Sequence, residues 1–139
     1  MIRVMARRNL EIGGEADVVR VRHAVRLIAR ASGFDAFATA AITTATSELT
    51  RNALVHGGGG VAVVEEVVED GLAGLRLTFR DTGPGISDLD RALAGGHSTS
   101  RTLGLGLSGS KRLVDGFEIT TETGVGTTVV ITKWARRRW

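Results

Sequence analysis

The chain has 139 residues, no cysteine, and 18 basic against 15 acidic residues, which gives a formal net charge of +3. This length suits one compact domain, and we expect residues 1–139 to form it alone. The lack of cysteine excludes disulfides and cysteine-ligated metal sites. No apolar run approaches the ~20 residues of a membrane span, and the first residues lack the apolar core of a signal peptide. We therefore expect a cytoplasmic protein.

The basic residues gather in two places, over residues 20–30 and from Lys133 to Arg138. Clusters of this kind usually form solvated surfaces, but they also fit phosphate contacts or an acidic protein partner. Aromatic residues make up only 4% of the chain and do not alternate with the basic ones. Because base stacking needs such residues, nucleic acid is the less favoured partner.

The first part of the chain predicts an edge strand followed by two helices. Residues 2–12 carry scattered apolar side chains, which suits an edge strand. A helix over 15–32, ended by Gly33, is predicted by apolar residues at helical spacing: Val18, Val21, Val25 and Ile28. A second helix over 35–56 has Asp35 as its N-cap and an apolar stripe: Ile42, Ala45, Leu49 and Ala53.

The rest of the chain predicts two hairpins separated by glycine-rich loops. The β-branched run 61–69 and the alternating run 75–80 flank Asp70-Gly71, a typical hairpin turn. A second hairpin is expected over 117–123 and 127–134. Between the hairpins we expect a short helix over 88–94, a mobile loop from Gly95 to Gly106 and a helix over 108–115. This order predicts an α+β fold, with a mixed, mostly antiparallel sheet and helices on one face.

Glu48 and Asn52 are the first candidate site residues. They lie four residues apart, so on a helix they share one side, next to the apolar stripe. A carboxylate can act as a general base, and an amide oxygen is a neutral ligand that a hard divalent ion accepts. Such a pair alone is usually surface decoration, so it needs support from elsewhere in the chain.

Asp81 begins the second candidate, the segment Asp81-Thr82-Gly83-Pro84-Gly85. The carboxylate follows a strand and can accept a hydrogen bond from an exocyclic amine such as that of adenine. Gly83 and Gly85 allow the backbone to approach a flat ring closely. The alternative is an ordinary Asp-x-Gly turn.

A third candidate is the G-x-G-x-x-G pattern formed by Gly104, Gly106 and Gly109 at the start of a predicted helix. Exposed backbone amides and a helix N-terminus favour an anion such as a phosphate. A dinucleotide-binding fingerprint is excluded by context, because that motif follows the first strand of a parallel βαβ unit. The Gly-Lys-Ser/Thr ending of the P-loop is also missing.

Taken in order, these motifs and the Gly126-Thr127 pair before the last strand resemble the GHKL (Bergerat) ATP-binding fold. Histidine kinases, gyrase, Hsp90-type chaperones and anti-sigma-factor kinases share this fold. The resemblance covers about residues 10 to 134. It implies a two-layer sandwich with an ATP lid loop that begins near Gly95.

The resemblance also implies a role for each motif residue. Asn52 would ligate Mg²⁺ between the phosphates of ATP, and Glu48 would be the general base. Asp81 would pair with the adenine amine. The adenine pocket would include Gly83, Gly85 and Thr127. Arg101 would stabilise the transferred charge, and the phosphates would be surrounded by Gly104, Leu105, Gly106 and Gly109.

Within this superfamily, a chain of this length resembles the serine kinases of bacterial partner-switching pathways. The segments SELTRNALVHGG, RDTGPGI and STSRTLGLGLSGSKRLVDGFEI are similar to the RsbT-type switch kinases, with RsbW-type anti-sigma kinases as the alternative. The resemblance implies phosphorylation of a STAS-domain antagonist protein. A metal-dependent serine phosphatase or a sigma factor would be the second partner, and another copy of the chain is a further candidate. A nucleotide-gated binding module with little turnover remains the other interpretation.

Overall fold

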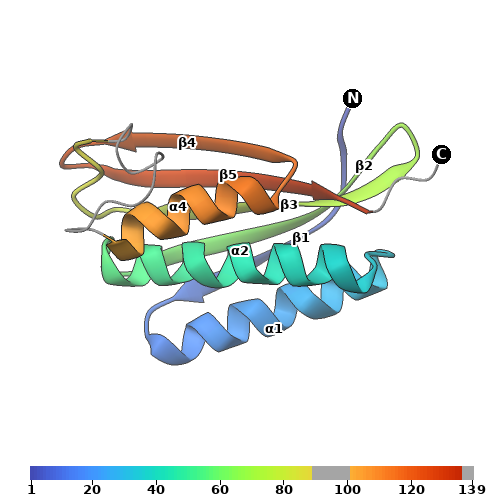
Figure 1. Ribbon diagram of the computed structural model, residues 1–139, viewed down its shortest axis with the longest axis horizontal. Helices are drawn as coiled ribbons and strands as arrows, with labels where there is room; N and C mark the ends of the chain where they lie inside the picture. The colour runs from blue at the N-terminus through green and yellow to red at the C-terminus, as the bar shows by residue number, and fades with distance from the viewer. Residues whose placement is uncertain (89–100, 136–139) are drawn as a thin grey trace.

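The computed structural model describes residues 1–88 and 101–135, without the side chains of residues 101–105. In this part of the chain, helices cover one side of a five-stranded sheet (Figure 1). The strands are β1 (Arg3–Ile12), β2 (Gly60–Glu69), β3 (Leu72–Asp81), β4 (Gly116–Glu122) and β5 (Gly126–Trp134). The helices are α1 (Glu15–Ala31), α2 (Ala36–Val55) and α4 (Arg101–Leu113).

The strand order is β1-β2-β3-β5-β4, and every neighbouring pair is antiparallel. The α+β class and the position of β1 at an edge are therefore confirmed. The expectation of some parallel pairing in a mixed sheet was wrong, because the described strands pair only in the antiparallel sense. Two of the pairs are tight hairpins, which can join only antiparallel strands.

The first hairpin turn fixes the register of β2 against β3. Asp70 and Gly71 both have positive φ, at 53° and 78°, as a type I′ turn requires. The predicted hairpin is confirmed, and β3 extends from Leu72 to Asp81, further than the predicted 75–80. This register places Asp81 opposite Gly60 of β2 and Thr127 of β5.

Each of the first two helices begins at a carboxylate that accepts backbone hydrogen bonds. Asp35 caps α2 as predicted, accepting from the Ala38 N–H at 2.7 Å. Near the start of α1, Asp17 accepts from the N–H groups of Gly13 and Gly14 at 2.7 and 3.1 Å. These bonds, chiefly that from Gly13, together with the Arg20 guanidinium hold the pKa of Asp17 below its usual value.

The core lies between the helices and the sheet. It includes Ile42 and Leu49 of α2, Leu75 and Leu77 of β3, and Ile131 of β5, all with at most 2% of their surface exposed. The alternation predicted for β3 is thereby confirmed. Within residues 1–88 and 101–135, no helix is long and apolar enough to cross a membrane.

The boundaries of α4 differ from those predicted. The helix starts at Arg101 and ends at Leu113, so the loop expected to reach Gly106 and the helix expected over 108–115 were misplaced. Packing outweighs the low helix propensity of glycine here: Leu107 is 1% exposed, and Gly106 contacts the Asn52 side chain of α2. Residues 89–100 lie outside the described part of the chain. The helix predicted over 88–94, apart from its first residue, and the loop residues 95–100 fall in this segment.

The sheet face away from the helices carries an ion-pair cluster on adjacent strands, in which Arg7 and Arg76 flank the buried Glu65. Glu65 is 5% exposed and receives Arg7 Nη2 at 2.7 Å and Arg76 Nε at 2.8 Å. Hydrogen bonding from Arg76, followed by that from Arg7, lowers the pKa of the Glu65 carboxyl despite its burial. The folded chain therefore binds the proton of Glu65 less readily than the unfolded chain.

Glu65→Gln is expected to lower the free energy of unfolding at pH 7 by about 2 kcal/mol, the scale of hydrogen bonds to a charged group. Since the folded pKa is depressed, this contribution is full above the unfolded pKa of about 4.3 and is lost as the pH falls through the folded value. Urea titrations at pH 7 and below pH 4 should show a difference that shrinks with acid. Glu118→Gln on exposed β4 is the control; an equal effect there, or a constant difference at all pH values, would contradict the assignment.

Candidate functional site

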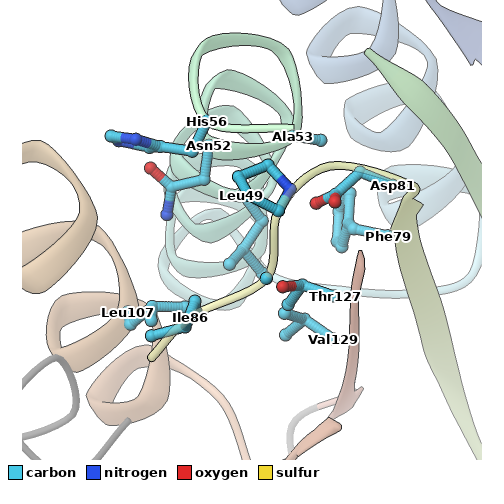
Figure 2. A pocket seen from close by; sticks show the side chains of 12 residues that line it. Leu49, Asn52, Ala53, His56, Phe79, Asp81, Ile86, Leu107, Thr127 and Val129 are labelled. Atoms are coloured by element: carbon cyan, nitrogen blue, oxygen red, sulfur yellow. The ribbon is translucent and has the colours of Figure 1, made fainter. Parts of the chain in front are cut away.

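A cavity of about 130 Å³ lies between α2, α4, the end of β3, the start of β5 and the loop after β3 (Figure 2). One buried water needs only roughly 15 Å³ on the same measure, so the cavity has room for a ligand group. Its walls combine apolar and polar side chains. The apolar ones are Leu49, Ala53, Phe79, Ile86, Leu107 and Val129, and the polar ones are Asn52, His56, Asp81 and Thr127; Pro84 and Gly85 complete the lining.

Asp81 and Thr127 face this cavity side by side, from adjacent strands (Figure 2). One carboxylate oxygen, Oδ1 of Asp81, accepts the Gly83 N–H at 3.0 Å, which fixes the carboxylate against its own loop. A carboxylate offers about four acceptor positions, so Asp81 retains the capacity to accept a hydrogen bond from a ligand. The half-buried position of Asp81 strengthens such a bond relative to one in water.

Gly57 makes room for the Asp81 carboxylate, and the sequence motifs did not include it. A Cβ added at Gly57 would overlap the Asp81 side chain and lie 2.7 Å from the Ala53 carbonyl oxygen. A Cβ at Gly83 would lie 2.5 Å from the Gly57 Cα. The two glycines therefore let the end of α2 and the loop after β3 interlock. The run Gly57–Gly60, directly after the predicted second helix, was the available sequence signal.

The two glycines of the Asp81 motif have different surroundings. Gly85 lines the cavity with φ at +79°, and a Cβ there would lie 2.6 Å from the Glu122 carbonyl oxygen. Gly83 packs behind the cavity, against the backbone at the end of α2. Both residues position the loop, and Gly85 alone of the two belongs to the lining.

Asn52 is the most unusual polar residue of the site. It is 7% exposed, and its amide oxygen and nitrogen are both buried without a hydrogen-bond partner among the described residues. Leaving a buried polar group unpaired costs about 1–3 kcal/mol, so such a group needs an explanation. The amide oxygen fits the oxygen-only preference of Mg²⁺, which normally takes few protein ligands and completes its shell with phosphates and water. Asn52 is therefore suited to coordinate, through its amide oxygen, a Mg²⁺ ion that also binds phosphate groups.

Glu48 lies one helical turn before Asn52 but does not line the cavity. Its side chain is 38% exposed, and its Oε1 lies 3.6 Å from Nη1 of Arg51. The structure thus brings Glu48 to the same side of α2 as Asn52 and leaves its carboxylate accessible from solvent.

The second glycine motif belongs to α4 rather than to a loop before it. Gly106 packs against Asn52, where a Cβ would lie 2.8 Å from Nδ2, while a Cβ at Gly109 would meet open space. Only the first four amides of a helix lack an internal partner, and in α4 these are the amides of Arg101–Gly104. The side chains of Arg101 and Leu105, and the surroundings of Gly104, lie outside the described part.

His56 is a lining residue that the sequence motifs missed. It lies four residues after Asn52 and eight after Glu48, so helical spacing was a signal for it. The apolar walls had no local signal. Leu49, Phe79 and Val129 follow ordinary core patterns, and only the packing of three elements leaves a cavity between them.

The family comparison agrees with this arrangement. Residues 14–133 match the model of the histidine kinase-like ATPase domain. The chain is 42% identical over 122 residues to the serine/threonine-protein kinase RsbT of Bacillus subtilis, covering 88% of this chain and 92% of that protein. It is 33% identical over 99 residues to an anti-sigma F factor of Geobacillus thermodenitrificans, covering 66% of each chain.

Two solved structures share the fold. The RsbU and RsbW domains of a Mycobacterium tuberculosis protein give a TM-score of 0.65 at 23% identity, covering 96% of this chain and 34% of that one. The SiaB–SiaC complex of Pseudomonas aeruginosa gives a TM-score of 0.57 at 16% identity, covering 95% and 91%. The chain therefore belongs to the histidine kinase-like ATPase family, and within it to the RsbT-type serine/threonine kinases of partner switching.

Proposed function

We propose that this chain binds Mg·ATP in the cavity beside Asp81 and transfers the γ-phosphate to a serine or threonine of a small STAS-domain protein. The observation that carries the proposal is the buried Asn52 amide, which has no hydrogen-bond partner among the described residues. It lies at the edge of a cavity that also holds an accessible carboxylate acceptor. A phosphate-bound Mg²⁺ and an adenine would satisfy these two groups together.

Adenine recognition would rest on Asp81 and the apolar walls. The Asp81 carboxylate would accept a hydrogen bond from the exocyclic amine, while Leu49, Phe79 and Val129 would cover the faces and edge of the ring. Burial of a flat apolar surface supplies affinity, and the single directed hydrogen bond supplies specificity.

Phosphate transfer would rest on positioning and charge neutralisation. Asn52 would hold Mg²⁺ through its amide oxygen; the bound ion supplies charge neutralisation on the phosphates. Glu48 would accept the proton of the attacking hydroxyl, and its exposed position suits a hydroxyl that arrives on another protein. The first turn of α4 would present backbone amides to the phosphates.

A second partner is part of this proposal. The resemblance to RsbT-type kinases implies a metal-dependent serine phosphatase, whereas the name of the anti-sigma F relative points to a sigma factor. The higher identity and coverage of the RsbT relative favour the phosphatase. Binding of purified phosphatase or sigma factor in the presence of ADP or ATP would separate these two choices.

Glu48→Gln is expected to lower phosphate transfer by at least about 100-fold, since general-base catalysis typically contributes 10²–10⁴-fold. The measurement is transfer of radiolabelled phosphate from ATP to the STAS protein of the same pathway, with ATP affinity measured in parallel. Affinity should stay within about threefold, because Glu48 does not line the cavity.

Glu15→Gln, at an exposed position in the first turn of α1, is the matched control. Undiminished transfer in Glu48→Gln would remove Glu48 from the chemistry. Nucleotide-dependent partner binding without any phosphorylated product in the wild-type protein would favour the binding-module alternative.

A further inference from the structure

Thr121 lies behind the cavity and touches two of its walls. It stands on β4 directly opposite Thr127 of β5, and the two hydroxyl oxygens are 3.0 Å apart. Its Oγ1 also accepts the N–H of Ile86 at 2.8 Å, and the Gly126 carbonyl oxygen lies 3.4 Å away. Thr127 and Ile86 line the cavity and Thr121 does not. One half-buried hydroxyl therefore joins the loop after β3 to the final hairpin.

The number of protons and lone pairs on the Thr121 hydroxyl limits the directions that its hydrogen bonds can take. A threonine hydroxyl has one proton to donate and two lone pairs to accept with. The Ile86 N–H occupies one lone pair of Thr121. Its proton has two acceptors within reach, and the 3.0 Å contact to Thr127 lies within the usual O–H···O range whereas the 3.4 Å contact to Gly126 lies beyond it. In the reverse arrangement Thr127 would donate to the second lone pair of Thr121, and Thr121 would donate along the longer contact to Gly126. The distances therefore favour donation from Thr121 to Thr127.

The direction of the Thr121–Thr127 hydrogen bond determines what Thr127 can offer to a ligand in the cavity. When Thr127 accepts from Thr121, its own proton is free to be donated to a ligand. The adjacent Asp81 carboxylate presents an acceptor. The wall thus offers one acceptor and one donor side by side. Adenine presents the complementary pair, an amine donor and a ring-nitrogen acceptor, whereas a 6-oxopurine presents an oxygen acceptor where adenine has its amine.

We propose that Thr121 is a positioning residue that orients the Thr127 hydroxyl as a donor and holds the loop after β3 at Ile86, so that the cavity selects adenine over 6-oxopurines. The inference rests on the proposed function, since it takes ATP as the ligand.

The test compares ATP with inosine triphosphate, its 6-oxo counterpart, by calorimetry on the wild-type protein and on Thr121→Val. Valine keeps the shape and removes the hydroxyl. ATP affinity should fall about three- to tenfold, the scale of one neutral hydrogen bond. The ATP:ITP affinity ratio should fall as well, because a Thr127 hydroxyl without its fixed donor can rotate to accept.

Thr121→Ser keeps the hydroxyl and should restore both the affinity and the ratio. Thr120→Val, on the opposite, exposed face of β4, is the matched control and should leave both unchanged. A purely structural role for Thr121 would weaken the two nucleotides equally, so a wild-type ratio in a weakened Thr121→Val would overturn the inference. So would a lowered ratio in Thr121→Ser. A wild-type protein that binds neither nucleotide would instead overturn the proposed function, and this inference with it.

Discussion

Asn52→Ala is expected to lower phosphate transfer by about 100- to 1,000-fold without lowering the stability of the nucleotide-free protein. The activity loss has the scale found when one group that stabilises transition-state charge is removed. The stability result follows because the buried Asn52 amide has no hydrogen-bond partner among the described residues, and removing such a group also removes its desolvation cost. When a residue supports function at a cost in stability, its removal should lower activity without lowering the free energy of unfolding.

Transfer assays and urea titrations of the same Asn52→Ala preparation provide the measurement. Asn9→Ala on exposed β1 is the matched control and should change neither quantity. If Asn52→Ala instead destabilised the protein strongly and kept full activity per folded molecule, Asn52 would be a structural residue and the metal assignment would fail.

Asp81→Asn is expected to weaken ATP binding by about 100-fold. The substitution keeps Oδ1, so the Gly83 N–H retains its acceptor and the loop its anchor. The new Nδ2 amide is a donor and would face the adenine amine, another donor, so an attractive contact becomes a repulsive one. Loss of a hydrogen bond to a charged group together with an unpaired buried donor costs about 2–4 kcal/mol, which corresponds to the expected ratio.

Calorimetry with ATP and with a purine nucleotide lacking the 6-amino group completes the test as a double-mutant cycle. The wild-type protein should prefer ATP, and Asp81→Asn should lose most of that preference. Asp70→Asn is the matched control, since Asp70 lies in the turn at the other end of β3 and its positive φ suits asparagine. Equal affinities of wild type and Asp81→Asn for ATP would show that Asp81 does not contact the base.

The sequence predicted those elements whose local signals agree with their packing. Asp35 caps α2, Gly33 follows the end of α1, and Asp70-Gly71 forms the first hairpin turn, each for a reason confined to a few residues. The start of α4 was not predictable in this way. Its glycines disfavour a helix locally, and the contact between Gly106 and Asn52 joins segments more than fifty residues apart.

The candidate site was predicted in part for the same reason. Asn52, Asp81, Gly85 and Thr127 were singled out by motif order, and the structure brings them to one cavity. Gly57 and Thr121 were missed, because each acts on a residue brought near it by the fold rather than by the chain. The importance of Gly57 is steric, and the glycine run at 57–60 gave no indication of its contact with Asp81. The importance of Thr121 is set by hydroxyl direction, which leaves no pattern in the sequence.

The central claim is that nucleotide binds in the cavity between α2 and the ends of β3 and β5. Backbone amide resonances recorded during a titration with Mg·ADP test it most directly, because they report the site residue by residue without turnover. The account predicts saturable shifts concentrated over residues 81–86, at Thr127 and in the turn after α2. Saturating ADP that leaves these resonances unchanged, or that shifts instead the open sheet face around Arg7 and Thr78, would contradict it.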